Sequence, residues 1–381
     1  MHALTRPPCN EQQALLRLLA CGATAGSLRR LLDSHGTAGA ALLAGARDWA
    51  SHGLDADACN AIRNPDSATM ARGERWLESA NRQLIGWRDP DYPPLLRRIS
   101  GPPAMLFVAG DAGLLWRPSV AIVGSRTATA GGCANAAAFA TALASAGLCV
   151  TSGLAAGIDA AAHTAALETD GATVAVLGTG PDIAYPLRNR PLLDRVAAEG
   201  AVISEHLPGT QPLRQHFPSR NRILAGLSLG TVVIEAAERS GALITARLAA
   251  DVGREVFALP GSIHNPMARG CHRLIREGAT LVESPAEVLA VLGPLAADLA
   301  RALRGELGAP IHSIQATIEP ALLSDPDYNR LWQALGHDPT GMDELVERSG
   351  LTAATVSSML LALELEGQVA AEHGRYCRIG V

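Results

Sequence analysis

Val120-Ala-Ile-Val-Gly-Ser-Arg126 joins an apolar run of strand length to a glycine turn. A continuous apolar run of this kind is typical of a parallel strand that is buried on both faces. In open α/β sheets, ligands bind at the carboxyl ends of such strands. The turn presents an arginine there, and a second arginine cluster follows at 216–222. Because guanidinium groups bind phosphate and carboxylate bidentately, we expect an anionic ligand at this edge of the sheet.

The segments around this strand repeat its pattern. Apolar runs of strand length alternate with alanine-rich helical segments, which predicts an α/β core with a Rossmann-like, doubly wound parallel sheet. The expected strands are 120–123, 148–151, 173–177, 201–204, 231–235, 255–259 and 280–282. The expected helices are 131–146, 156–168, 189–199, 241–252 and 269–277. Proline pairs in 92–96 and 101–107 predict an extended connector before the first of these strands.

The two ends of the chain differ from this core. Leucine pairs at helical spacing over 11–32, interrupted by Gly22 and Gly26, predict a small helical domain of the SAM or helix-hairpin-helix kind. Helical patterns near the C-terminus, followed by a hairpin around His373 and Gly374, predict a winged helix. We therefore expect a helical domain at 1–82, a core at 83–292, a linker with one helical piece at 293–325 and a winged helix at 326–381.

The third winged-helix helix, expected at 352–365, would ordinarily contact DNA. It carries Glu364, with Glu366 just beyond it, and no arginine, so it is poorly suited to a phosphate backbone. We expect this domain to contact protein or to have lost DNA binding.

The composition excludes several classes of protein. The 381 residues are 48% hydrophobic with a net charge of −5, as expected for a folded chain, and no apolar run is long enough to span a bilayer. All 32 basic residues are arginine, which removes Schiff-base and Walker-type lysine chemistry. The seven cysteines lack metal-ligand spacing and fit reduced thiols. We expect a cytoplasmic protein with no cofactor and no metal.

Three successive expected strands end in glycine turns, at Gly124, Gly153 and Gly178. Neighbouring turns of this kind would form a row of backbone N–H groups, to which helix N-termini add positive dipole ends. With arginines nearby, the row favours an anion site over plain tight connections.

Several motifs then occur in a fixed order. They are Val120-Ala-Ile-Val-Gly-Ser-Arg126, Thr151-Ser-Gly-Leu-Ala-Ala-Gly-Ile-Asp159 with His163, Val176-Leu-Gly-Thr-Gly180 with Tyr185-Pro186, Ile203-Ser-Glu205, Phe217-Pro-Ser-Arg-Asn-Arg-Ile223, Glu235-Ala with Ser240-Gly-Ala-Leu-Ile-Thr-Ala246, and Ala258-Leu-Pro-Gly261. Together they resemble the DNA-processing protein A (DprA, also called Smf) family over about 85–290. The resemblance implies a homodimeric protein without enzymatic turnover that binds single-stranded DNA, protects incoming DNA in natural transformation and loads the RecA recombinase onto it.

The expected DNA contacts combine the resemblance with the residue chemistry. Arginines would follow the phosphates, Phe217 would stack on a base, and glycine-turn residues would approach the backbone. Arg188 and Arg214 stand where the family often has lysine. The expected contacts are Gly124, Ser125, Arg126, Gly153, Ala155, Gly157, Arg188, Arg214, Phe217, Arg220, Asn221 and Arg222. Phe217 has an alternative role as a core anchor, and Asn221 and Arg222 as helix caps. An apolar helix within 241–295 is the expected dimer contact.

Other functions remain as alternatives. Asp159 and His163, four apart on a helix, are either an acid–base pair or a local hydrogen-bonding group. Glu235 is either a catalytic carboxylate, or it closes a buried polar network or lies near the dimer contact. A nucleoside-monophosphate ribohydrolase of the related Rossmann-like group would need Pro-Gly-Gly-x-Gly-Thr-x-x-Glu, and this chain lacks the Pro-Gly-Gly. A dehydrogenase would need Gly-x-Gly-x-x-Gly, which is also absent, and a transcription regulator would need a basic recognition helix.

Overall fold

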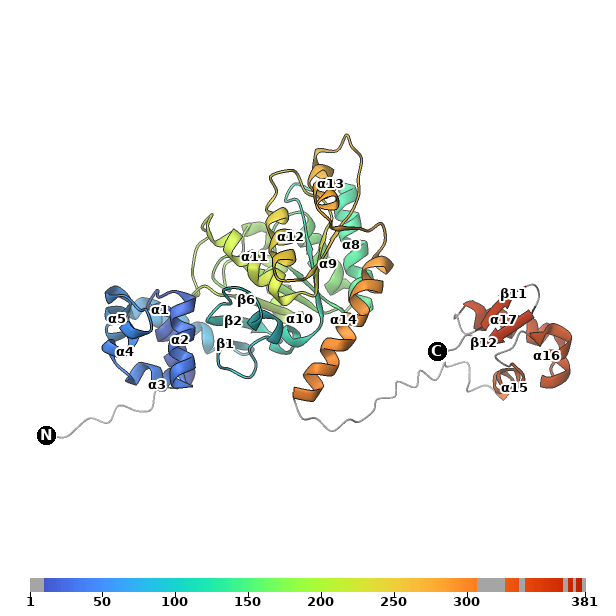
Figure 1. Ribbon diagram of the computed structural model, residues 1–381, viewed down its shortest axis with the longest axis horizontal. Coiled ribbons are helices and arrows are strands. Elements are labelled where there is room, and N and C mark those ends of the chain that lie inside the picture. The colour runs from blue at the N-terminus through green and yellow to red at the C-terminus, as the bar shows by residue number, and fades with distance from the viewer. Residues whose placement is uncertain (1–9, 307–325, 336–339, 366–368, 373–374, 379–381) are drawn as a thin grey trace. The chain divides into compact units, whose positions relative to one another are not determined.

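The computed structural model describes residues 10–306, 326–335, 340–365, 369–372 and 375–378 (Figure 1). Contacts divide the chain into two units, 1–308 and 309–381, and each is described by itself. The strands of the first unit are β1 (Arg82–Gly86), β2 (Met105–Gly110), β3 (Ser119–Val123), β4 (Cys149–Ser152), β5 (Thr173–Leu177), β6 (Ala201–Ser204), β7 (Gly230–Val233), β8 (Glu255–Ala258) and β9 (Thr280–Leu281).

The helices of this unit fall into two groups. Those before β2 are α1 (Glu11–Ala20), α2 (Ala25–His35), α3 (Ala38–Leu43), α4 (Ala46–Ser51), α5 (Ala56–Arg63), α6 (Ser67–Leu77) and α7 (Pro94–Arg97). Those after it are α8 (Ala130–Ser145), α9 (Ile158–Glu168), α10 (Arg190–Glu199), α11 (His216–Leu227), α12 (Gly241–Asp251), α13 (Arg269–Arg276) and α14 (Pro285–Glu306). Short 3₁₀ turns are η1 (Ala112–Trp116), η2 (Leu187–Asn189) and η3 (Pro266–Ala268).

The sheet has nine strands in the order β1-β2-β6-β5-β4-β3-β7-β8-β9. From β6 to β9 all neighbours are parallel, and β3 pairs with β7 from Val120 opposite Gly230 to Val123 opposite Val233. The chain steps from β3 through β4 and β5 to β6, then returns to the other side of β3 as β7. The strand order therefore reverses between β3 and β7, and the carboxyl ends of these two strands form the expected ligand crevice.

Both faces of the sheet are covered, as expected for a doubly wound fold. Val120 and Ile122 of β3 pack in one core with α8, α9 and α14, whereas Ala121 and Val123 pack in another with α11, α12 and α13. The alternation follows from the two-residue period of a strand, and it explains why the whole run is apolar. The prediction of a Rossmann-like doubly wound core is confirmed.

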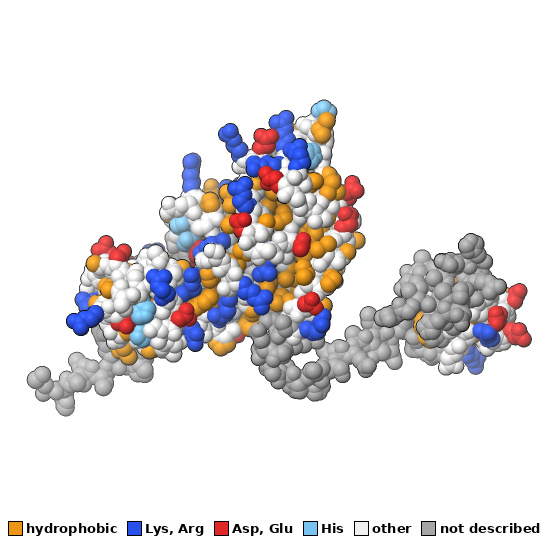
Figure 2. All heavy atoms as spheres, viewed as in Figure 1, with side chains coloured by type: hydrophobic (Ala, Val, Ile, Leu, Met, Phe, Trp, Pro, Cys, Tyr) orange, Lys and Arg blue, Asp and Glu red, His pale blue; other side chains and the backbone are white. Residues whose placement is uncertain are grey.

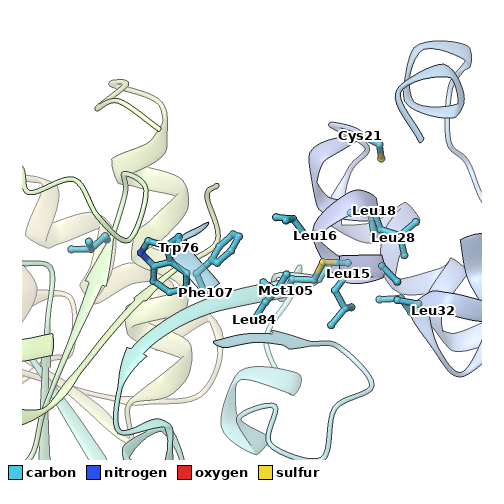
Figure 3. Packing of buried hydrophobic residues seen from close by; sticks show 14 of the residues in the cluster. Leu15, Leu16, Leu18, Cys21, Leu28, Leu32, Trp76, Leu84, Met105 and Phe107 are labelled. Atoms are coloured by element: carbon cyan, nitrogen blue, oxygen red, sulfur yellow. The ribbon is translucent and has the colours of Figure 1, made fainter. Parts of the chain in front are cut away.

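The N-terminal helices share a core with the sheet. Leu15 and Leu16 of α1 pack in the same cluster as Leu84 of β1 and Phe107 of β2 (Figure 3). The side chain of Gln12 adds a pair of hydrogen bonds to the backbone of Leu84, both 3.0 Å. Packing is therefore continuous across the boundary expected at residue 82. The boundary expected at residue 292 lies inside α14, and residues 307–325 of the expected linker are outside the described part of the chain.

Three local expectations were wrong. Residues 94–97 form the short helix α7, because Pro94 stands in its first turn, where the missing N–H costs nothing. Residues 105–110 form β2, which together with β1 adds an antiparallel edge to the parallel sheet. Asn221 and Arg222 lie inside α11 and not at its ends, so their alternative role as helix caps is wrong, and the side chains of 216–222 are distributed around a helix.

The second unit is a winged helix, which confirms the prediction for the C-terminal end. Three helices, α15 (Pro326–Ala334), α16 (Met342–Ser349) and α17 (Ala353–Leu365), enclose a core that includes Leu331, Leu345 and Leu360. The three-stranded sheet orders β10 (Thr340–Gly341), β12 (Arg375–Arg378) and β11 (Val369–Glu372). The expected hairpin turn at 373–374 lies outside the described residues. Among all described residues, no helix is long and apolar enough to cross a membrane.

Candidate nucleic-acid interface

A groove of about 690 Å³ lies where the strand order reverses. Its walls come from the turn after β3 (residues 124–127), the start of α11 and the segment 237–245 that leads from β7 into α12. Arginine side chains gather on the end of the core that carries α12 and α13 (Figure 2). The groove is therefore the predicted crevice, and the fold rather than sequence proximity brings its walls together.

Four arginines line this groove. Arg126, Arg214 and Arg239 are exposed, whereas Arg220 is 4% exposed. Asp159 is the one carboxylate among the described lining residues, and it is buried beneath them. The excess of positive charge makes the groove suitable for a polyanion, and the three exposed guanidinium groups are accessible to phosphate oxygens.

Two aromatic rings stand in the same groove. Phe217 is half-buried, and the guanidinium carbon of Arg126 lies 5.2 Å from the centre of its ring. The ring of Tyr185, with that residue 42% exposed, lies 5.2 Å from the Phe217 ring at an interplanar angle of 41°. Phe217 also packs over Gly178, where an added Cβ would lie 3.2 Å from its Cδ1. Phe217 is thus anchored against Gly178 on one side, and Arg126 and Tyr185 lie next to its ring on the groove side, where a base would have to displace the guanidinium.

A buried polar group forms the floor. The Arg220 guanidinium donates through Nη1 to the carbonyl of Val176, and its Nε donates to Asn221 Oδ1 at 3.1 Å. Burial lowers the pKa of Arg220 to about 10, with Asp159 opposing the shift, so this side chain stays charged at neutral pH. Burial raises the pKa of Asp159, while the Arg220 charge and two backbone N–H groups counteract the rise. Arg220 therefore adds a buried positive charge at the floor of the groove.

The turn after β3 is held by close backbone packing. An added Cβ on Gly124 would lie 2.6 Å from Ile158 Cγ1 and 2.8 Å from the carbonyl oxygen of Glu235. Gly157 has a φ of +77°, and its missing side chain leaves room for the backbone of Ser125 and Arg126. The N–H of Ile158 donates to the carbonyl of Ser125 at 3.2 Å. These contacts fix the direction in which Arg126 leaves the sheet.

Eight of the twelve expected contacts line the groove: Gly124, Ser125, Arg126, Ala155, Arg214, Phe217, Arg220 and Asn221. The other four, Gly153, Gly157, Arg188 and Arg222, are outside its lining. Arg188 is exposed, on the turn η2 beyond Tyr185. Arg222 forms an ion pair of 2.5 Å with Glu205, and the two side chains are 22% and 15% exposed. Arg222 therefore has an internal partner on another side of α11 from Phe217, and its expected contact with a ligand stays a prediction.

The expected row of free backbone N–H groups is also largely absent. The N–H of Ser125 donates to the carbonyl of Glu235 at 2.7 Å. Those of Gly153 and Ala155 both donate to Oδ2 of Asp159, at 3.1 and 3.3 Å. An internal carboxylate thus takes the place that an anionic ligand would occupy, and side chains carry the candidate site instead.

Among the lining residues that sequence reasoning missed, Arg239 and Tyr185 have side chains suited to a nucleic acid. Arg239 follows the carboxyl end of β7, so the strand-order reversal would have placed it opposite Arg126 had the order been known. Tyr185 was noted only as part of a Tyr-Pro pair. An aromatic residue in a chain with 3% aromatic content, three residues before an arginine, was the available signal.

The residues that suggested catalysis have internal partners. His163 is fully buried and its Nδ1 lies 2.7 Å from the Thr173 hydroxyl, while burial lowers its pKa to about 3. Glu235 accepts hydrogen bonds from the backbone N–H and the hydroxyl of Thr129 at 2.9 and 2.7 Å, and from Asn265 at 3.3 Å. Asp159 and Glu235 therefore both belong to internal hydrogen-bond networks, in agreement with the non-catalytic alternatives.

Comparison with known proteins gives consistent results. Residues 83–293 match the model of the DNA recombination-mediator protein A family, and residues 315–375 match the DprA winged helix domain. Protein Smf of Escherichia coli is 41% identical over 305 residues, covering 80% of this chain and 79% of that protein. Protein Smf of Synechocystis is 39% identical over 325 residues, covering 79% and 81%.

Solved structures agree with these sequence matches. The X-ray structure of DNA processing protein A from Streptococcus pneumoniae is similar with a TM-score of 0.67 and 40% identity, covering 73% of this chain and 97% of that one. DNA processing protein A from Helicobacter pylori has a TM-score of 0.50 and 28% identity, covering 54% and 94%. The fold, the order of the motifs and these matches lead to one conclusion: the chain belongs to the DNA recombination-mediator protein A family.

Proposed function

We propose that this protein binds single-stranded DNA without sequence preference. The observation that carries the proposal is the groove, which is lined by three exposed arginines and by the neighbouring rings of Phe217 and Tyr185. Proteins that bind single strands combine a positive track for the backbone with aromatic surfaces for bases. The relative from H. pylori, described by its single-stranded DNA binding mode, supports the same ligand.

The aromatic pair favours a single strand over a duplex. Bases in a duplex are already stacked and paired, so their faces are not available to a protein ring. A positive groove without aromatic rings would bind both forms through phosphate alone. Phe217 and Tyr185 therefore predict a preference for flexible strands. The proposed contacts are to phosphates and base faces and not to base edges, so binding should tolerate any sequence.

Further roles follow from family membership. We infer that the protein protects incoming DNA during natural transformation, loads RecA onto it, acts in the cytoplasm and forms a homodimer through its core. The description of the family as a recombination mediator supports the RecA role. Sedimentation of the full chain tests the dimer, and RecA assembly on strands coated with single-strand-binding protein tests the loading. The absence of enzymatic turnover, the four-part domain division and the contact role of Arg188 stay predictions.

An enzymatic function of the ribohydrolase kind has less support. Both carboxylate oxygens of Glu235 accept hydrogen bonds inside the fold, and Asp159 is occupied by two backbone N–H groups. A carboxylate in such a network is not positioned as a nucleophile or base for a bound ribose.

Fluorescence anisotropy with a labelled oligothymidine tests the main proposal. A mixed-sequence strand should bind similarly, the corresponding duplex much more weakly, and a mononucleotide should compete poorly. If the three exposed arginines each neutralise one phosphate, log K should fall with log salt with a slope of about −2, at about 0.7 per phosphate. Equal binding of duplex and single strand, or release of free base from a mononucleotide, would contradict the proposal.

A further inference from the structure

The N-terminal helices bring two histidines and an aspartate together, within the helical region that precedes β1. His35 is the last residue of α2, Asp48 lies in α4, and His52 follows the end of α4. Nε2 of His35 is 2.7 Å from Oδ2 of Asp48, and Nδ1 of His52 is 3.5 Å from the same oxygen. One possible ligand atom from each residue lies within 4.8 Å of the others.

The arrangement has the donor set of a transition-metal site. Imidazole and carboxylate are ligands that Zn²⁺ and its first-row neighbours bind well. Asp48 and His52 are four residues apart, and their ligand atoms face each other, as in metal pairs placed at i and i+4 on a helix. His35 adds a third ligand from a different helix. We propose that His35, Asp48 and His52 bind a divalent transition-metal ion of the Zn²⁺ class, with water completing the coordination.

The donor atoms would have to shift for an ion to bind. Metal–ligand bonds of about 2.0–2.2 Å in a tetrahedral site place donor atoms roughly 3.3–3.6 Å apart. The 3.5 Å between His52 Nδ1 and Asp48 Oδ2 matches this separation, whereas the 2.7 Å between His35 Nε2 and the same oxygen must open by roughly 0.6–0.9 Å. The donor atoms of the two imidazoles lie within 4.8 Å of each other and would move to the same separation. All three residues are half-buried, so an ion and its waters have access from solvent.

The surrounding contacts hold His52 in place. Arg30 donates from Nη2 and Nε to the backbone carbonyl of His52, at 2.9 and 3.3 Å. Nδ1 of His52 also lies 2.9 Å from the backbone carbonyl of Asp48, so the metal would replace a proton that this nitrogen shares with the carbonyl and the carboxylate. The proposal departs from the sequence-based expectation of no metal, which rested on cysteine spacing and did not consider residues that the helices bring together.

Isothermal titration of the full, chelator-treated chain with ZnCl₂ tests the proposal. We expect one saturable equivalent, which is lost in His35→Gln and in His52→Gln. The loss of affinity should exceed the roughly 10–100-fold that follows removal of an outer-shell partner. Asp48→Asn keeps the shape of the side chain and removes its charge, and it should also weaken binding. His264→Gln, an exposed histidine outside the cluster, serves as the control and should bind as the unmodified chain does.

Two further measurements keep the result interpretable. Co²⁺ should give visible absorption bands of a low-coordinate site, and Zn²⁺ should raise the unfolding temperature of the unmodified chain and the control only. Circular dichroism and affinity for oligothymidine show whether each variant is folded. The absence of saturable binding would overturn the proposal, and the three residues would then only hydrogen-bond one another within the helical region. Unchanged binding in folded histidine variants would overturn it as well, because the ion would then be held elsewhere.

Discussion

Replacing Phe217 by leucine separates base stacking from phosphate binding. The half-buried ring touches Gly178 on its inner side and is covered by Arg126 and Tyr185 towards the groove. Leucine keeps an apolar side chain against Gly178, so the start of α11 should stay folded. It removes the flat surface on which a base would rest.

The structure sets the size of the effect. Base–aromatic stacking contributes about 1–3 kcal/mol per base, which corresponds to a loss of roughly 5–150-fold in affinity if one base stacks on Phe217. The Arg126 guanidinium now occupies the ring face, and an exposed cation–π contact contributes about 0.5–1 kcal/mol that a base must replace. We therefore expect the lower half of the range. Because leucine changes no charge, the dependence of log K on log salt should keep its slope.

Arg126→Ala should give the opposite signature. It removes one phosphate contact, so the slope should become shallower by about 0.7 while affinity falls for every sequence. Arg247→Ala makes the same change of charge on α12 but outside the groove lining, and it should leave the slope unaltered. Anisotropy titrations of the three variants at several salt concentrations measure both quantities.

Two results would refute this reasoning. If Phe217→Leu lowered the salt slope, the ring would act by holding Arg126 and not by stacking. If its affinity for single strands were unchanged, with thermal unfolding like that of the unmodified chain, Phe217 would be only a core anchor for α11.

Arg222→Ala should destabilise the fold by about 1–3 kcal/mol in chemical denaturation, because it leaves the Glu205 carboxylate unpaired. In anisotropy titrations it should not change the slope of log K against log salt, and a shallower slope would place Arg222 on DNA. Gly153→Ala should cost about 1–3 kcal/mol in urea denaturation, since its Cβ would lie 2.6 Å from Cζ of the buried Arg220; unchanged stability would show that the guanidinium moves freely. Burial lowers the pKa of His163 to about 3, against about 6.5 in the unfolded chain, so its contribution to stability is fully present above pH 6.5 and is lost as the pH falls towards 3. His163→Leu should therefore make the free energy of unfolding depend less steeply on pH, by up to about 1.4 kcal/mol per pH unit. Identical pH profiles of the variant and the unmodified chain would contradict the assignment.

The sequence predicted the core well, because its strands carry strong local signals. The run from Val120 to Val123 is apolar at every position, and the structure shows why, since each face of β3 packs against helices. The antiparallel edge was missed because β1 and β2 are specified by pairing with the sheet. Pro94 was misread because proline disfavours a helix interior yet suits its first turn, and only the position of the helix distinguishes the two cases.

The site was less predictable than the fold. The sequence shows which residues carry charge, but not which of them meet an internal partner. Arg220 and Arg222 are two residues apart on α11, and one enters the floor of the groove while the other pairs with Glu205. Likewise, Gly153 and Ala155 follow a strand end as anion-binding turns do, yet Asp159 of the same segment accepts both of their hydrogen bonds. Whether such a residue can meet a ligand depends on its hydrogen-bond or ion-pair partner, which lies either far away in the sequence or within the same turn.

The net charge of −5 does not oppose binding of a polyanion, because screening limits the range over which charges act. At physiological ionic strength the Debye length is about 8 Å, so exposed carboxylates elsewhere on the surface contribute little to the potential in the groove. The groove is lined by four arginines and one carboxylate, that of Asp159, which is buried and accepts hydrogen bonds from two backbone N–H groups. The local excess of positive charge therefore determines the interaction. An Asp159→Asn variant tests this: if the local balance governs affinity, a folded variant should bind single strands more tightly at low salt, and the difference should shrink as salt is added.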